Sequence, residues 1–141
     1  MDQILFFNED IKYELPSVKK TTNWLLMIAQ AENHTIEDLN YIFCSDEHLL
    51  SINQEFLNHD YYTDIITFDN SDEPHIIKAD IFISIDRVNE NATTNKVSLV
   101  EELNRVMAHG LLHLLGYNDK TPTEQKAMRQ KEDSCLSLFP K

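Results

Sequence analysis

The chain has 141 residues, of which 42% are apolar, a length and composition that suit one globular domain with one core. Its 12 basic residues against 24 acidic ones give a formal charge of −12, which disfavours non-specific binding to DNA or RNA, because phosphate neutralisation supplies most of that affinity. Seven of the 12 basic residues nevertheless fall between residues 87 and 131, which allows a local basic patch there.

Cysteine usage and the apolar runs point to the cytoplasm. Cys44 and Cys135 match no metal or redox spacing, and two such residues predict reduced thiols rather than a disulfide framework. The first ten residues do not resemble a signal peptide, and no apolar run is long enough to span a membrane. We therefore expect a cytoplasmic protein without a membrane partner.

The first half of the chain is predicted to contain two strands and two helices. A short apolar strand is expected over residues 4–7, and apolar residues at helical spacing predict a helix over residues 18–32. A β-rich segment follows over residues 34–44. Ser45 is a good N-cap for a second helix over residues 46–56, whose first turn is acidic.

Two further strands are predicted in the middle of the chain, over residues 64–69 and 79–86. The second is nearly continuously apolar, so we expect it inside the sheet and not at an edge. Residues 93–96 are a polar break.

The last part of the chain is predicted to be helical. Ser98 caps a helix over residues 99–115 that ends at Gly116, and Thr123 caps a final helix over residues 124–139. Strands thus alternate loosely with helices, which favours an α+β class. We expect a single domain over residues 1–141, with a mixed sheet of about four strands and helices packed on it.

Residues 109–119, HGLLHLLGYND, contain a candidate metal site at the end of the central helix. His109 and His113 lie about 40° apart on the helical wheel and one turn apart, so both imidazoles can bind one zinc ion. Gly116 lets the chain turn, and the spacing HxxxHxxGxxD then offers Asp119 as a third ligand. Three protein ligands leave a position for water, as in catalytic zinc sites.

Each part of this motif also has an ordinary structural interpretation. An HxxxH pair alone is a weak signal, and Asp119 suits a turn, but the combination favours a metal. Gly110 argues against a zinc peptidase, in which the residue after the first histidine is the glutamate that takes a proton from water. We expect Gly110 to serve packing, by letting another backbone approach.

A second group of polar residues lies upstream. Asp64 follows a loop that holds His59 and Asp60, and Thr67 comes three residues later. The ordinary interpretations are a strand-start residue for Asp64 and β propensity for Thr67, and these are favoured. His59 is expected at the surface, where it is a candidate contact to substrate.

These segments together resemble the YbeY-type endoribonuclease family of bacterial rRNA maturation factors. The family signature HGxLHLxGYDH is matched at His109, Gly110, Leu112, His113, Leu114, Gly116 and Tyr117. Residues 52–57 and 63–68 resemble the family segments LNxxYR and TDVLSF, and residues 79–84 resemble GDIxIS. The order and separation of the segments agree, so the resemblance covers most of the chain.

The resemblance implies a small α+β fold with one zinc ion per chain at the three-ligand site. It implies hydrolysis of single-stranded RNA, namely an rRNA precursor, in ribosomal RNA maturation and ribosome quality control. A ribosome or ribosomal protein is an implied partner, and DNA is not expected. Zinc would activate water or polarise a phosphoryl oxygen, and such chemistry does not need the peptidase glutamate.

Two positions depart from the family pattern. Asp119 replaces the third histidine ligand, and an anionic ligand shifts metal preference toward harder ions. Leu57 replaces an arginine associated with RNA binding, and leucine cannot grip phosphate. His59 and Arg105 are the candidate catalytic residues expected to contact phosphate in its place.

The leading hypothesis is therefore a zinc-dependent, single-strand-specific endoribonuclease. The alternative is a ribosome-assembly factor that binds a ribosomal or protein partner and has weak or no nuclease activity, which the acidic composition and Leu57 favour. A metal-dependent hydrolase of a small substrate is a third hypothesis.

Overall fold

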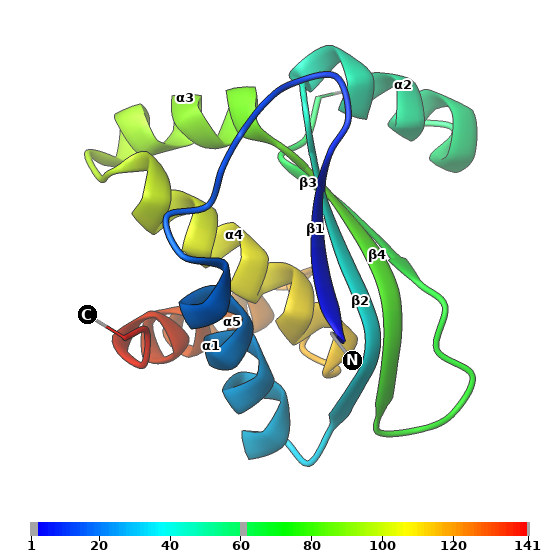
Figure 1. Ribbon diagram of the computed structural model, residues 1–141, viewed down its shortest axis with the longest axis vertical. Coiled ribbons are helices and arrows are strands. Elements are labelled where there is room, and N and C mark those ends of the chain that lie inside the picture. Colours follow the sequence, from blue (N-terminus) through cyan, green and yellow to red (C-terminus); the bar gives the residue numbers. More distant parts are fainter. Residues whose placement is uncertain (1–2, 60–61, 141) are drawn as a thin grey trace.

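The computed structural model describes residues 3–59 and 62–140 of the chain (Figure 1). The elements within these ranges are β1 (Ile4–Asn8), α1 (Val18–Ala31), β2 (Thr35–Cys44), α2 (Asp46–Leu57), β3 (Ile65–Asp69), β4 (Ile76–Ser84), α3 (Ile85–Asn95), α4 (Leu99–Leu114) and α5 (Pro122–Ser137). None of the described helices is both long and apolar enough to cross a membrane.

The four strands form one mixed sheet in the order β1-β2-β4-β3. Strands β1, β2 and β4 are parallel, whereas β3 runs antiparallel to β4 at the edge. This confirms the predicted α+β class and the four-stranded mixed sheet. It also confirms that β4 lies inside the sheet, between β2 and β3, although its burial alternates along the strand, so one face is covered more fully than the other.

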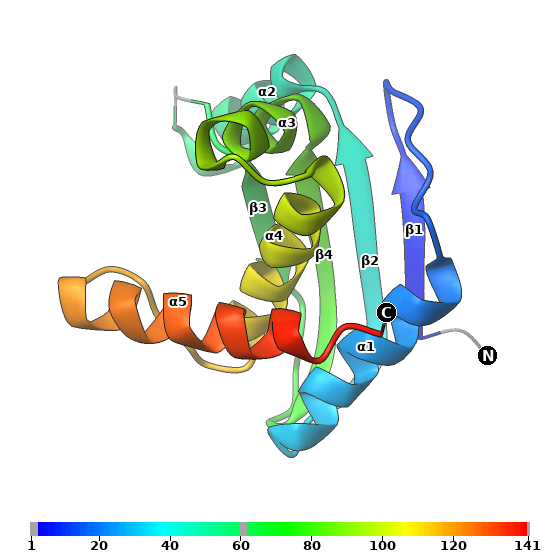
Figure 2. The ribbon, with the colours of Figure 1, turned by 90° about the vertical axis from the view of Figure 1, so that its left-hand side faces the viewer.

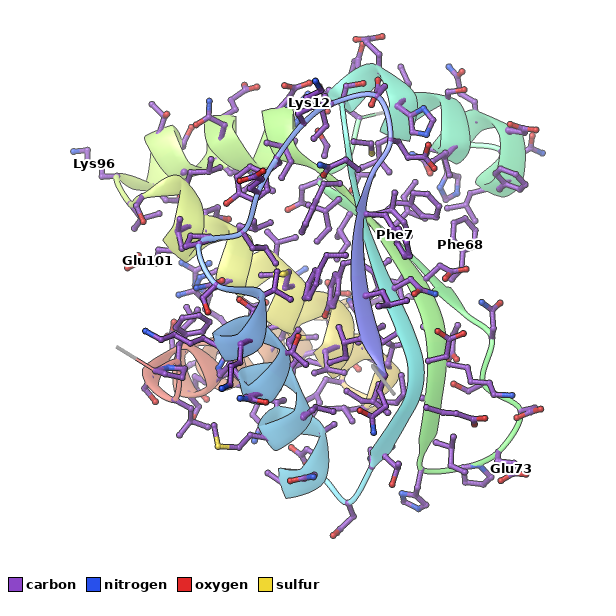
Figure 3. All side chains as sticks on the ribbon, in the orientation of Figure 1. Phe7, Lys12, Phe68, Glu73, Lys96 and Glu101 are labelled. Carbon is purple, nitrogen blue, oxygen red and sulfur yellow. The ribbon has the colours of Figure 1, made fainter. Side chains whose placement is uncertain are left out.

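Helices cover the two faces of the sheet unequally. Figures 1 and 2 show α1, α4 and α5 on one side of the sheet, while α2 covers only one end of the other side. The larger core lies between the sheet and the first group of helices and contains Trp24, Tyr41, Ile81 and Met107, all fully buried. Figure 3 shows side chains filling this layer.

Cys44, in the smaller core under α2, is a buried free thiol, as is Cys135.

Helix α4 is the central helix of the larger core. It contacts α1, α3 and α5 as well as β3 and β4. The hydroxyl of Tyr41 donates a hydrogen bond of 2.9 Å to the carbonyl oxygen of Met107, which joins the middle of the sheet to α4. The end of α4 is therefore fixed on several sides, as a rigid scaffold for a functional site requires.

The prediction missed helix α3 and placed the preceding strand too late in the chain. The strand expected over residues 79–86 begins earlier and ends at Ser84, whose hydroxyl accepts a hydrogen bond of 3.0 Å from the backbone amide of Arg87 and so caps α3. Helix α3 buries only Val88 and Ala92, a narrow apolar stripe on an otherwise polar helix. The residues expected as a polar break are its last turn and its C-cap, Lys96.

Helix α5 also begins earlier than predicted, because Thr121 and not Thr123 is its N-cap. The Thr121 hydroxyl accepts a hydrogen bond of 3.1 Å from the amide of Glu124, and the Glu124 carboxylate accepts one of 3.0 Å from the amide of Thr121. Pro122 occupies the first helical position, which suits its fixed φ angle.

Candidate metal centre

The last turns of α4 present two histidines toward the same point. His109 and His113 are four residues apart, and their ring centroids lie 4.6 Å apart in an edge-to-face arrangement. After α4 the chain turns at Gly116, whose φ of 106° lies in the region that favours glycine. This turn brings Asp119 back beside the two imidazoles, as the sequence predicted.

The three side chains form a triangle of ligand atoms. The Nε2 atoms of His109 and His113 are 3.0 Å apart, and Oδ2 of Asp119 lies 3.3 Å from the first and 3.4 Å from the second. Nitrogen and oxygen ligands bound tetrahedrally to zinc at about 2.0–2.1 Å lie about 3.3 Å from one another. The residues present therefore fit a metal ion, with aspartate in the place of the third histidine.

A buried carboxylate binds the imidazole of His109, the first candidate ligand. Nδ1 of His109 donates a hydrogen bond of 2.6 Å to Oε2 of Glu132 on α5. A proton held on Nδ1 leaves the lone pair of Nε2 directed toward the triangle, which is the form a metal ligand needs. Only 5% of the surface of Glu132 is exposed, so water competes little for this bond.

The charges around His109 and Asp64 shift their pKa values. Burial of the His109 imidazole opposes protonation, but the hydrogen bond to Glu132 and the charges of Glu132, Asp119 and Asp64 outweigh it and raise the pKa of His109. Burial also raises the pKa of Asp64, against the influence of His109. Bringing these carboxylates together around one imidazole is costly unless a cation joins them.

Two cavities, of about 360 Å³ and about 390 Å³, meet at the candidate metal centre. Asp64, His109 and Asp119 line both of them. The first extends over α5 toward Arg129, and the second extends over the end of α2 toward Leu57. The two cavities therefore share a wall at the candidate metal centre.

The two residues predicted to contact phosphate lie in different cavities. His59 lines the second cavity together with His113. Arg105 lines the first, but its guanidinium is already paired with Glu132 at 3.0 Å and with Asp133 at 2.6 Å. A phosphate contact by either residue stays a prediction, and Asp60 lies outside the described residues.

Gly110 serves packing, but against side chains and not against another backbone. A Cβ atom at this position would lie 2.9 Å from Cδ1 of Ile65 and 3.0 Å from Cδ1 of Ile81. The absence of a side chain lets α4 lie close to β3 and β4, which carry these isoleucines.

Two carboxylates of the site, Glu132 and Asp64, were not predicted from the sequence. Glu132 has a signal in hindsight, because it lies on one face of α5 with Met128 and Cys135, and all three are buried. A carboxylate within an apolar stripe needs a partner. The sequence predicts Asp64 at the start of a strand, and it does lie just before β3, but it also lines both cavities, which the sequence did not indicate.

Comparisons with known proteins show the family to which the chain belongs. A model of the family described as endoribonuclease YbeY matches residues 3–139. The endoribonuclease YbeY of Cytophaga hutchinsonii is 56% identical over 137 residues, which cover 97% of this chain and 96% of that protein. The endoribonuclease YbeY of Flavobacterium psychrophilum is 48% identical over 138 residues, which cover 96% of each.

The fold is also similar to a solved structure. A protein from Thermotoga maritima, known from a solution structure, is 27% identical and superimposes with a TM-score of 0.65. The match covers 95% of this chain and 87% of that one. Family model, full-length relatives and fold all agree, and the chain therefore belongs to the endoribonuclease YbeY family.

Proposed function

We propose that this protein is a zinc-dependent endoribonuclease that cleaves single-stranded RNA in ribosomal RNA maturation and ribosome quality control. Membership of the endoribonuclease YbeY family makes the chain a metal-dependent endoribonuclease, a hydrolase of RNA phosphodiester bonds. The observation that carries the metal dependence is the triangle formed by His109, His113 and Asp119, with spacings of 3.0, 3.3 and 3.4 Å. Two imidazoles and one carboxylate favour zinc over magnesium or calcium.

The residues of the site have distinct parts in this proposal. His109, His113 and Asp119 would hold the ion, which when bound supplies Lewis acidity for hydrolysis of a phosphodiester. Gly110 offers no peptidase-type base, so the site suits phosphodiester better than peptide hydrolysis. Asp64 lies at the junction of the two cavities, where it borders the place of the scissile phosphate.

The paired cavities support a single-stranded substrate. Cleavage requires one phosphodiester group to reach the ligands, while the nucleotides on each side need space beyond them. Cavities of similar volume extend in both directions from Asp64, His109 and Asp119. An unpaired strand can bend into such a depression, whereas bases in a duplex are held by stacking and pairing.

Basic side chains beside the site support RNA binding in spite of the net charge of −12. Arg105 and Arg129 line the first cavity, and His59 lines the second. We propose that the phosphates flanking the cleavage point contact Arg129 and His59, whereas the guanidinium of Arg105 is already paired with Glu132 and Asp133.

A cleavage assay with matched substrates tests the proposal. Chelator-stripped protein reloaded with zinc should cleave a single-stranded RNA oligonucleotide and leave the same sequence intact in a duplex. The stripped protein and the His113→Ala variant should both be inactive. Wild-type rates in His113→Ala would contradict a catalytic metal.

The alternative of a ribosome-assembly factor is favoured by one observation, since Leu57 and not an arginine lines the second cavity. In cells that lack the protein, wild-type chain should restore rRNA processing and His113→Ala should not. Full restoration by His113→Ala would instead support a binding role without cleavage.

A further inference from the structure

Three side chains on α4 and α5 form a continuous chain of hydrogen bonds that ends at a candidate ligand. Nη1 of Arg105 donates to Oε1 of Glu132 at 3.0 Å, and Nδ1 of His109 donates to Oε2 of the same carboxylate at 2.6 Å. Arg105 and His109 lie one turn apart on α4, so both can face a single residue on α5. Each oxygen of Glu132 therefore has its own partner.

This arrangement leaves Glu132 little freedom. The side chain of Glu132 is 7% exposed, and that of Arg105 is 16% exposed. Arg105 is held from its other side by Asp133, at 2.6 Å. A buried carboxylate fixed by a guanidinium presents its second oxygen in one direction, toward the imidazole.

We infer that Glu132, oriented by Arg105, is a positioning residue that sets the ring orientation and the tautomer of His109 for metal binding. The inference rests on the proposed function only in taking His109, His113 and Asp119 as a metal site. An acceptor at Nδ1 keeps the proton there and leaves Nε2 free to bind. Without the acceptor, the tautomer with a proton on Nε2 competes and the ring can turn, so the metal binds less tightly.

A purely structural ion pair between the two helices would not need His109. In such a pair both oxygens of Glu132 would face Arg105, the usual bidentate arrangement. Here one oxygen of Glu132 accepts a hydrogen bond from His109, and the second terminal nitrogen of Arg105 donates to Asp133. Glu132 therefore binds the imidazole of His109 instead of forming a bidentate pair with Arg105.

The neighbouring residue provides a matched control. Asp133 is adjacent in the sequence to Glu132 and binds the same guanidinium, but its side chain is 60% exposed and its recorded contact is with Arg105. Removing its charge changes the environment of Arg105 without touching the hydrogen bond to His109. Glu132→Gln and Asp133→Asn therefore differ mainly in what happens at the ligand.

Zinc affinity of the stripped protein, measured by competition with a chromophoric chelator, tests the inference. We expect zinc binding to weaken by about 10–100-fold in Glu132→Gln and by less than about threefold in Asp133→Asn. Equal zinc affinity in wild type and Glu132→Gln would overturn the positioning role. Failure of the proposed function gives a different result, because wild type itself would then bind no zinc. Failure of the positioning role alone leaves zinc binding intact in both proteins.

The visible absorption spectrum of the cobalt(II)-loaded protein gives a second measure, which a general loss of stability would not change. The visible absorption bands of the cobalt-loaded protein should shift in Glu132→Gln, because the orientation of one ligand changes, and should match wild type in Asp133→Asn. Unchanged bands in Glu132→Gln would contradict the inference. Arg105→Lys, which keeps the charge but not the fixed fork, should give a smaller shift in the same direction.

Discussion

The hydroxyl of Tyr117 donates a hydrogen bond of 2.6 Å to Oε1 of Glu32, joining the segment that carries Asp119 to the end of α1. Lys131 on α5 reaches the same carboxylate oxygen at 3.1 Å, and its ammonium lies 5.9 Å from the centre of the Tyr117 ring. The segment between α4 and α5 is therefore fixed from two helices. The third candidate ligand depends on this anchorage for its position.

Tyr117→Phe tests the anchorage. The substitution keeps the ring but removes the hydrogen bond to Glu32, and we expect the metal-free protein to lose about 1 kcal/mol of unfolding free energy. Zinc affinity should also fall, because Asp119 becomes less well placed. Denaturant unfolding and chelator competition measure the two effects. Lower stability with unchanged zinc affinity would show that the position of Asp119 does not depend on the hydrogen bond between Tyr117 and Glu32.

Glu32 also predicts a pH dependence of stability. The hydrogen bond from Tyr117, with the nearby charge of Lys131, lowers the pKa of Glu32 below its ordinary value of 4.5. A carboxyl whose pKa is lower in the folded state stabilises the fold above that ordinary value and loses this contribution as the pH falls through the lowered pKa.

Glu32→Gln should therefore be less stable than wild type at neutral pH, and the difference should shrink as the pH falls below 4.5. Urea unfolding of the two metal-free proteins at a series of pH values provides the measurement. A difference that stays constant down to about pH 3 would contradict the role assigned to the charge.

Gly110→Ala should destabilise the protein by about 1 kcal/mol. Alanine favours the helix by up to about 1 kcal/mol, but overpacking of a core costs about 1–3 kcal/mol, and the new methyl group would meet Ile65 and Ile81 at 2.9 and 3.0 Å. Ile65→Val removes the nearer atom, so the double variant should be more stable than the sum of the single effects predicts. If the stability changes of the two single variants simply add in the double variant, the strain does not arise from contact with Ile65.

Leu57→Arg should strengthen RNA binding. Leu57 lines the second cavity and is 40% exposed, so an arginine there can reach a phosphate of a strand that enters the cavity. Binding of single-stranded RNA to the stripped protein should tighten by about 3–10-fold, with the salt dependence steeper by about 0.7 for each added phosphate contact. Leu57→Met is the neutral control. A gain in both variants would rule out a charge effect.

The cluster of candidate metal ligands could be predicted because the relationship of the three residues is local. His109 and His113 are one helical turn apart, and Gly116 reverses the chain just before Asp119, so the spacing alone nearly determines the triangle. The internal place of β4 could also be predicted from its nearly continuous apolar run, which is typical of a strand with a neighbour on each side.

The rest of the site depends on tertiary packing. Glu132 accepts its hydrogen bond from His109 across two different helices, α5 and α4. No local sequence pattern determines how these two helices cross. Arg105 looked free to bind phosphate for the same reason, since its partners lie on α5. Helix α3 escaped prediction because it buries only two residues and is held mainly by its packing on α4.

The metal content of purified protein tests the central claim most directly. Elemental analysis should find one zinc ion per wild-type chain and a large loss in both His113→Ala and Asp119→Ala, with Asp119→His retaining the ion because histidine is also a zinc ligand. The Asp133→Asn variant, whose exposed carboxylate lies outside the triangle, should match wild type. Equal zinc content in wild type and Asp119→Ala would contradict the three-ligand site.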